Sequence, residues 1–335
     1  MKQPAFVIVV GASAGGVNAL CELIGQVDPG INASLFIVMH LSRNTLSDFL
    51  VHRLQPLTSM PCVLAEDGGK IERGKVYIAS ANFHLLVKKE EILLGRGPDE
   101  NGWRPCIDAL FRSAAAAYNS RTIGIILTGM RDDGTAGMLA IKRSGGVCIV
   151  QDPEEAEHPD MALSVLNNME VNYCLSLSQM GKVLENITQH IPEEIAVPAD
   201  VAVEAEIAER VVVSYENVKQ LGEKSIYACP DCGGGLWNIS GKEGNKERVV
   251  RYRCHIGHSY SENDLVIKQG EIFEATLWTA LRIMEERRNL FLKLDQDHRK
   301  RGLTTIARGY QDKASEIQVH VDKMKEVLFA SQKIG

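Results

Sequence analysis

The chain of 335 residues has no long apolar run and no excess of basic residues, and each absence argues against a class of protein. The apolar stretch before Gly11 is too short for a signal peptide, and no window approaches the roughly 18 apolar residues of a membrane span. Lys and Arg number 37 against 43 Asp and Glu, and the only basic cluster is the short run Arg299–Arg301. We therefore expect a cytoplasmic protein that neither inserts into a membrane nor binds nucleic acid through charge.

Internal repeats and low-complexity tracts are also absent, and the composition of 45% hydrophobic and 24% charged residues is ordinary for a globular protein. The length predicts two or three domains, because single cores seldom grow beyond roughly 250 residues. We assign an α/β domain to residues 1–190, a linker or strap to 191–224, a small Cys- and His-rich segment to 225–261, and a helical region to 262–335.

The first domain alternates apolar, β-rich runs with helical ones. The runs AFVIVV, SLFIVM, TIGIILTG and VCIVQD are nearly all apolar, which is typical of strands buried on both faces. We expect helices over Val17–Ile24, Leu46–Leu54 and the segment AGMLAIKRSG, and we interpret KVYIAS as a strand and HLLVKKEEILLG as a hairpin. The pattern predicts an α/β fold with a doubly wound, mostly parallel, Rossmann-like sheet, whose functional residues gather at the carboxyl ends of the strands.

After residue 190 the composition changes. The linker is acidic and rich in Ala and Val, with two prolines. In the last region apolar residues recur at helical spacing, which predicts a helical hairpin, with one helix from Glu262 and another after Gly302. We expect residues 225–335 to fold back as a lid or to form a dimer module.

The motif GASAGG after the first strand has two chemical interpretations. A dinucleotide fingerprint needs glycine where Ser13 stands, and it needs an acidic residue after the second strand, where His40 stands instead. A nucleophile elbow needs a serine between a strand and a helix, and Ser13 has that context. A tight turn that only requires small residues is the simpler explanation of the motif by itself.

Two further strands deliver the other residues of a possible triad. His40 ends the run SLFIVM and can take a serine proton, and GMRDDG after TIGIILTG supplies Asp132 and Asp133, one of which can orient the imidazole. Taken singly, these would be a surface histidine and a helix-capping turn. Together at one edge of the sheet, they point to acyl transfer. Their order, Ser-His-Asp, does not fit the α/β-hydrolases, which run Ser-Asp-His.

GASAGG, VMHLS, KVYIASANFHLLV, RPCIDALFRSAA, LTGMRDDGTAGM and GGVCIVQDPEEAEHPDM resemble, in order and spacing, the catalytic domain of the CheB-type protein-glutamate methylesterases of bacterial chemotaxis. The resemblance covers residues 5 to about 190. It implies that Ser13 is the nucleophile, His40 the base and Asp133 the third member of the triad, since Asp132 fills a variable position of GM-x-x-D-G. Arg131 stands where the family often has glycine.

The resemblance implies a hydrolase that needs no cofactor for catalysis. It would release methanol from glutamate methyl esters of a methylated chemoreceptor or similar protein through an acyl-enzyme, and it could also deamidate glutamine. The chain begins at the first strand of the esterase, so we expect no receiver domain ahead of it and no control by phosphorylation in cis. Control would come from the C-terminal part, from a homodimer or from a separate regulatory protein.

A second cluster lies at Cys229, Cys232, Cys254 and His258. The spacing C-x2-C, then C-x3-H, is typical of a zinc ribbon with a structural Zn²⁺ bound by four ligands. His255 competes with His258 for the fourth position, but adjacent residues such as Cys254 and His255 are difficult to aim at one ion. Free thiols or a redox pair at Cys229 and Cys232 are the alternatives, although the glycines after Cys232 argue against a redox motif.

The sequence leaves one competing hypothesis for the whole chain. The ribbon-like segment and the helices could recruit a partner, with the α/β domain as a weakly active or inactive scaffold.

Overall fold

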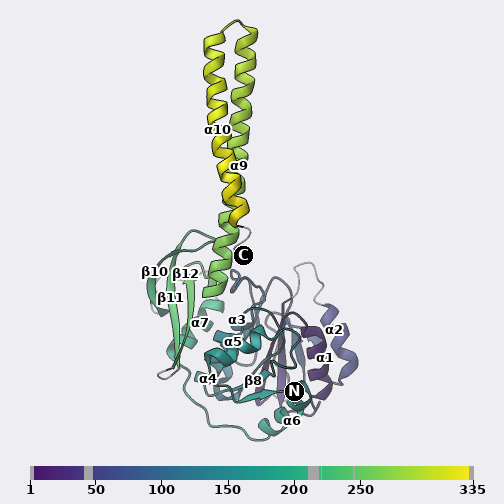
Figure 1. Cartoon of the computed structure of the whole chain (residues 1–335). Coiled ribbons are helices and arrows are strands. Elements are labelled where there is room, and N and C mark those ends of the chain that lie inside the picture. Colours follow the sequence, from purple (N-terminus) through teal and green to yellow (C-terminus); the bar gives the residue numbers. More distant parts are fainter. Residues whose placement is uncertain (1–3, 41–47, 210–218, 220, 244–245, 332–335) are drawn as a thin grey trace. The chain divides into compact units, whose positions relative to one another are not determined.

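The computed structural model describes the chain except residues 1–3, 41–47, 210–218, 220, 244–245 and 332–335 (Figure 1). The chain divides into two compact units, residues 1–264 and 265–335. In the described part of the chain, no helix is both long enough and apolar enough to cross a membrane.

The first unit is built on a seven-stranded sheet in the order β3-β4-β2-β1-β7-β8-β9, in which every strand pair is parallel. The strands are β1 Phe6–Ala12, β2 Ala33–Met39, β3 Cys62–Leu64, β4 Val76–Ile78, β7 Thr122–Ile126, β8 Val147–Gln151 and β9 Tyr173–Leu175. The predicted parallel sheet is confirmed, including the four apolar runs and KVYIAS. The short edge strands β3 and β9 were not predicted, because three residues give no periodic signal.

Helices cover both faces of this sheet, as the alternation of strand side chains requires. Helices α3, α4 and α5 lie on one side of the sheet, and α1, α2 and α6 on the other (Figure 1). Val7 and Val9 pack with the first set, and Phe6, Ile8 and Val10 with the second. The helices are α1 Gly16–Gln26, α2 Asp48–Leu54, α3 Ile107–Tyr118, α4 Thr135–Arg143, α5 Asp160–Asn168 and α6 Leu177–Ile187. The helix predicted from Leu46 begins at Asp48 in the described residues, and Leu46 itself lies outside them. The predicted hairpin HLLVKKEEILLG is the antiparallel pair β5 His84–Val87 and β6 Ile92–Gly95.

The segment predicted as a linker contains helix α7, Ala199–Glu209. Its buried residues include Glu204 alongside apolar side chains. Polar and apolar residues therefore do not separate onto two faces, and the helix has no amphipathic pattern. Ile207 packs against Trp237 of the following sheet, and Ala208 against Leu86 and Ala109. Helix α7 therefore packs into the first unit and does not act as a free linker.

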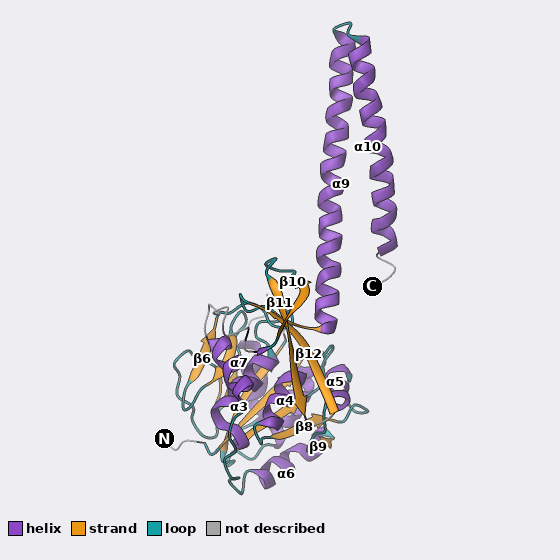
Figure 2. Cartoon of the chain, turned by 90° about the vertical axis from the view of Figure 1, so that its left-hand side faces the viewer, coloured by secondary structure: helices purple, strands orange, loops and turns teal. Residues whose placement is uncertain are grey.

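A four-stranded antiparallel sheet follows, in the order β10-β11-β12-β13. Its strands are β10 Glu223–Ala228, β11 Gly235–Glu243, β12 Lys246–Cys254 and β13 Ser259–Ser261. Strand β11 contacts helix α4, and strand β12 contacts helix α5; both helices cover the seven-stranded sheet (Figure 2). The Cys- and His-rich segment predicted at 225–261 forms this sheet.

The second unit contains most of α9, Glu262–Lys300, and all of α10, Thr304–Ser331. The two helices pack side by side as a hairpin (Figure 2), with Phe291 stacked on Tyr310 and Lys325 paired with Glu285 at 2.9 Å. Both helices appear where helical spacing predicted them. Gly302, with a φ of 78°, lies in the turn between them.

Candidate active site

Ser13 directly follows β1, in the turn that leads into α1. Gly15 adopts a φ of 74° at the start of α1, a conformation that side-chain-bearing residues rarely take, and this explains the glycine at that position. The Ser13 N–H donates to the Thr128 carbonyl at 3.0 Å, so the turn is fixed to the loop after β7. Gly129 in that loop has no room for a side chain, because a Cβ there would lie 2.8 Å from the Ser13 Cβ.

His40 follows β2, the neighbour of β1, and its N–H donates to the Ala12 carbonyl at 3.1 Å. Its Nε2 lies 2.8 Å from Oδ2 of Asp133, and the imidazole side chain is only 1% exposed. The Trp103 ring stacks on the imidazole with centroids 4.2 Å apart and planes 5° apart. His40 Nδ1 is buried and has no hydrogen-bond partner among the described residues. The free ring nitrogen is therefore Nδ1.

Asp133 lies in the loop between β7 and α4, where its carboxylate meets the N-terminus of α3. Oδ2 accepts the Ile107 N–H at 2.8 Å, and Oδ1 accepts the Asp108 N–H at 3.2 Å, together with bonds from the side chains of Asn101 and Cys106. Burial acts to raise the pKa of Asp133, but these bonds and the His40 imidazole hold that pKa below its usual value. The carboxylate is thus kept ionised against His40.

The neighbouring Asp132 makes no hydrogen bond to His40 in the described residues. It lies beside Ser261 of β13, and burial raises the pKa of its carboxyl group. Ser13 makes no side-chain hydrogen bond to His40 in the described residues, a looseness that is common in hydrolase sites without substrate. Of the residues predicted from sequence, the structure brings His40 and Asp133 into direct contact, places Ser13 at the same sheet edge, and sets Asp132 apart.

Asn101 and Trp103 belong to this site, and sequence reasoning missed both. Asn101 donates through Nδ2 to Asp133 and to Asp108, each at 2.9 Å, and Trp103 covers the imidazole face. Both lie in an irregular segment before α3 that has no periodicity. The available signal was the position of the segment, directly before the quoted motif RPCIDALFRSAA.

A buried network of charges surrounds this segment. Arg112 of α3 pairs with Glu100 and lies 3.5 Å from Glu204 of α7. Arg253 of β12 also reaches Glu100, at 2.7 Å, and Arg251 forms two bonds to Glu204 at 2.9 and 2.7 Å. Burial acts to raise the pKa of each glutamate, yet the arginines hold the pKa of Glu204 at about 2 and that of Glu100 well below its usual range. The network joins α3, α7 and β12.

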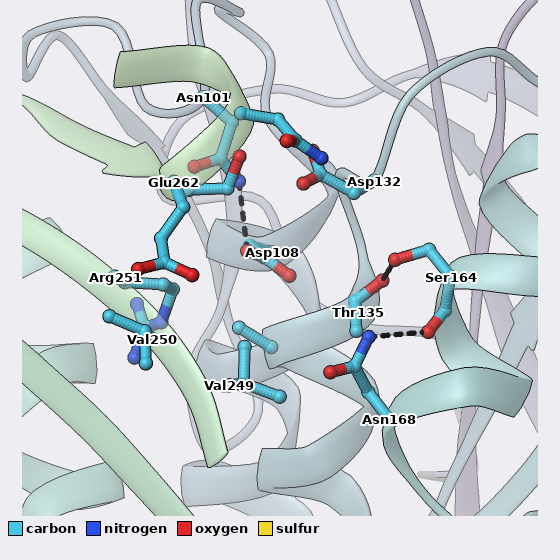
Figure 3. Close-up of a pocket in the computed structure, with 13 residues that line it drawn as sticks. Asn101, Asp108, Asp132, Thr135, Ser164, Asn168, Val249, Val250, Arg251 and Glu262 are labelled. Carbon is cyan, nitrogen blue, oxygen red and sulfur yellow. Dashed lines mark hydrogen bonds between the residues drawn. The ribbon is translucent and has the colours of Figure 1, made fainter. Parts of the chain in front are cut away.

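A polar cavity of about 170 Å³ lies next to this network (Figure 3). Asn101 and Asp108 line it from the triad side, Thr135 and Ser164 from α4 and α5, and Arg251 from β12. Neither Ser13 nor His40 contributes to its lining. The cavity is therefore not the place where an ester would meet Ser13.

The second predicted cluster is also brought together by the fold. One ligand atom from each of Cys229, Cys232, Cys254 and His258 can be chosen so that all four lie within 4.8 Å of one another. Cys229 and Cys232 come from the turn between β10 and β11, and the other two from the turn between β12 and β13. The three cysteines form no disulfide bond. His258 directs its Nδ1 toward the sulfurs of Cys229 and Cys254. The competing His255 is not a member of the cluster.

A family model described as CheB methylesterase matches residues 8–184. A putative protein-glutamate methylesterase/protein-glutamine glutaminase of Leptospira interrogans is 34% identical over 188 residues, which are 56% of this chain and 97% of that protein. The protein-glutamate methylesterase/protein-glutamine glutaminase of Methanosarcina barkeri is 34% identical over 189 residues, 54% of this chain and 52% of its own length. The chain thus spans nearly the whole of the first relative and about half of the second.

Among solved structures, the catalytic domain of the Thermotoga maritima CheB methylesterase superposes with a TM-score of 0.53 at 30% identity. The match covers 56% of this chain and 100% of that domain. The family model ends before α7, so it covers the sheet and the three triad candidates and leaves out α7 and β10–β13.

Proposed function

Because the chain belongs to the CheB methylesterase family, we propose that it hydrolyses glutamate methyl esters on proteins, with Ser13 as nucleophile, His40 as base and Asp133 as the residue that orients the base. The observation that carries the proposal is the pair of His40 Nε2 and Asp133 Oδ2 at 2.8 Å, beside the serine turn after β1. This pair lies at the carboxyl edge of a parallel sheet, where strand β1 is flanked by β2 and β7.

The bonding of His40 assigns a role to each ring nitrogen. Since Nε2 donates to the ionised Asp133, Nδ1 is the nitrogen with a free lone pair. Nδ1 takes the hydroxyl proton of Ser13 as the Ser13 Oγ attacks the ester carbonyl. His40 then gives that proton to the leaving methoxy oxygen as the C–O bond breaks, and methanol is released. His40 then takes a proton from water as the water attacks the acyl-enzyme. This step frees Ser13 and leaves a glutamate side chain.

The oxyanion needs N–H donors close to Ser13. The N–H groups of Ser13, Gly16 and Gly129 already donate to backbone carbonyls. Ala14 and Met130 stand in the same two loops, and their N–H groups have no acceptor within the residues that the structure describes. We assign the oxyanion hole to these two groups.

The substrate class follows from the relatives, which are named for two reactions, protein-glutamate methylester hydrolysis and protein-glutamine deamidation. A glutamine side chain would pass through the same acyl-enzyme, with ammonia as the leaving group in place of methanol. A methylated chemoreceptor or a similar protein is the expected substrate. The chemistry needs no cofactor.

Self-association is a second candidate function, and it concerns the second unit. Large apolar side chains of α9 and α10 are about half exposed, among them Phe273, Ile283, Leu290, Val319 and Phe329. Such side chains on one hairpin are typical of an interface between proteins. Sedimentation of the full chain and of a chain ending at Lys268 tests this function, since loss of the hairpin should lower the mass of the assembly.

The test of the esterase uses an alkyl fluorophosphonate, which reacts with activated serines, and methanol release from a methylated chemoreceptor. The probe should attach to Ser13, and Ser13→Ala should abolish both labelling and methanol release. Ser178→Ala is the matched control, because Ser178 is exposed on α6, and it should keep both activities. Normal methanol release from Ser13→Ala would refute the proposal.

A further inference from the structure

The cluster of Cys229, Cys232, Cys254 and His258 lies outside the region that the CheB model matches. We propose that these four residues bind a structural Zn²⁺ and that the ion fixes the turn which holds Asn101 and Trp103 against the triad. The first part stands on the geometry of the cluster alone. The second part rests on the proposed function, because it concerns the reactivity of Ser13.

Three distances between ligand atoms of the cluster match those of a tetrahedral zinc site. With Zn–S bonds of about 2.3 Å and Zn–N bonds of about 2.0–2.1 Å, tetrahedral geometry separates two sulfurs by about 3.8 Å and a sulfur from a nitrogen by about 3.5 Å. The Cys232 and Cys254 sulfurs are 3.7 Å apart. His258 Nδ1 lies 3.6 Å from the Cys229 sulfur and 3.4 Å from the Cys254 sulfur. A disulfide would need sulfurs about 2.05 Å apart.

The backbone of both turns is shaped to aim the side chains inward. Gly233, with a φ of 72°, donates to the Cys229 carbonyl at 2.8 Å, and Gly257, with a φ of 113°, donates to the Cys254 carbonyl at 3.0 Å. The turn from Cys254 is closed by its N–H to the His258 carbonyl, also at 3.0 Å. Three sulfurs and one imidazole form a donor set that zinc prefers.

The next shell supports the cluster as well. The Tyr260 hydroxyl lies 3.2 Å from the Cys229 sulfur and donates to Asp231 at 2.6 Å. Such outer contacts orient the ligands of metal sites. His255, by contrast, packs by Gly234, where an added Cβ would lie 2.8 Å from its ring. We therefore assign the fourth ligand to His258.

The turn between Cys254 and His258 is flanked on both sides by contacts to the triad segment. Arg253, directly before Cys254, pairs with Glu100 at 2.7 Å. Ser259, directly after His258, accepts the Asn101 N–H at 2.8 Å through its carbonyl. An ion that binds Cys254 and His258 would thus fix both ends of the turn at once.

The contacts continue from this segment to the reacting groups. The Asn101 side chain donates to Asp133 Oδ1 at 2.9 Å, and two residues later Trp103 stacks on His40. Asn101 is therefore a positioning residue, which acts through Asp133. Loosening the turn would loosen Asn101 and Trp103, and small displacements of such groups lower rates by about tenfold to a hundredfold.

Metal content tests the first part. The full chain, purified under reducing conditions without added metal, should contain one zinc per chain by elemental analysis, and cobalt-substituted protein should show thiolate-to-cobalt absorption. Cys229→Ser and His258→Ala should lose the ion, whereas His258→Cys and His255→Ala should keep it. Cys174→Ser is the control, because Cys174 is exposed and outside the cluster. Absence of zinc, or zinc that persists in Cys229→Ser, would overturn the site.

The rate of Ser13 labelling by the fluorophosphonate tests the second part. Removal of zinc by a chelator should slow labelling by about tenfold or more, and zinc should restore it. Far-ultraviolet circular dichroism verifies that the α/β domain stays folded, and His255→Ala, outside the cluster, should label at the wild-type rate. Unchanged labelling after zinc removal would overturn the coupling. Absence of labelling in the zinc-loaded wild type would refute the esterase instead, and would leave the zinc site standing.

Discussion

Asp133→Asn tests the site at its most constrained residue. The substituted amide has one acceptor oxygen, whereas the carboxylate now accepts from five groups, two at Oδ2 and three at Oδ1. If the amide nitrogen takes the Oδ2 position, it donates to His40 Nε2, and the ring proton must move to Nδ1. That tautomer cannot accept the proton of Ser13.

The other orientation is also unfavourable. With the amide nitrogen at the Oδ1 position, it faces Asn101 Nδ2, the Cys106 thiol and the Asp108 N–H, all of which are donors in a buried site. Each donor left unpaired costs about 1–3 kcal/mol of stability. We expect kcat to fall by about 10⁴-fold, as for the corresponding change in other triads, which is about 5.5 kcal/mol in activation free energy.

Methanol release from a methylated receptor, measured well below the melting temperature of each variant, gives this number. Asp132→Asn is the matched control. Asp132 is half-buried and its Oδ1 has no hydrogen-bond partner in the described residues, so removal of its charge should change kcat only a few-fold and should not lower stability. If Asp133→Asn keeps more than about a tenth of the wild-type kcat, or if Asp132→Asn loses more activity than it does, the assignment of the third triad member fails.

Two further changes test the packing around the site. Glu204→Gln should lower the free energy of unfolding at pH 7 by about 3–5 kcal/mol, because it leaves Arg251 and Arg112 buried without this partner. The pKa of Glu204 is about 2 in the folded state, so its contribution to stability is complete above about pH 4.5 and is lost as the pH falls toward 2. The free energy of unfolding of Glu204→Gln should therefore depend less on pH in that window than that of the wild type. The control Glu185→Gln, at an exposed position, should behave as wild type. Equal acid dependence in wild type and Glu204→Gln would contradict the network. Gly129→Ala should lower both kcat and the melting temperature, because its Cβ would meet Met161 and lie 2.8 Å from the Ser13 Cβ. The control is Gly25→Ala, where no atom lies within 4 Å of the added Cβ, and its stability should rise slightly. An unchanged kcat of Gly129→Ala would argue against a fixed nucleophile turn.

The sequence was most informative where local chemistry and strand order coincide. Ser13, His40 and Asp133 each follow an apolar run, and parallel strands place such residues at one edge without further information. The four ligand candidates were visible for a similar reason, because C-x2-C and C-x3-H spacings report turns. The contact of Asp133, rather than Asp132, with His40 could not be derived from the residues themselves, since two adjacent carboxylates differ only in the direction the backbone gives them.

Features that depend on long-range partners were missed. The acidic, Ala- and Val-rich composition around α7 predicts a linker or strap, and it does not reveal that Glu204 pairs with arginines far away in the sequence. Asn101 and Trp103 have meaning only beside Asp133 and His40, which other strands deliver. A pattern of hydrophobicity cannot report a buried ion pair, because it counts each charge as a surface residue.

The buried charges also determine how this protein can be recombined with its relatives. A catalytic module cut near residue 190, close to where the family model ends, would leave Arg112 without Glu204 and Glu100 without Arg253. A chimera that carries the sheet alone into another family member would keep the pair of Arg112 with Glu100, and would need substitutes for Glu204 and Arg253. Exchange as a block that keeps residues 1–264 together would preserve every one of these pairs. The part of the chain that has to be exchanged as a whole is therefore larger than the part that carries the triad candidates.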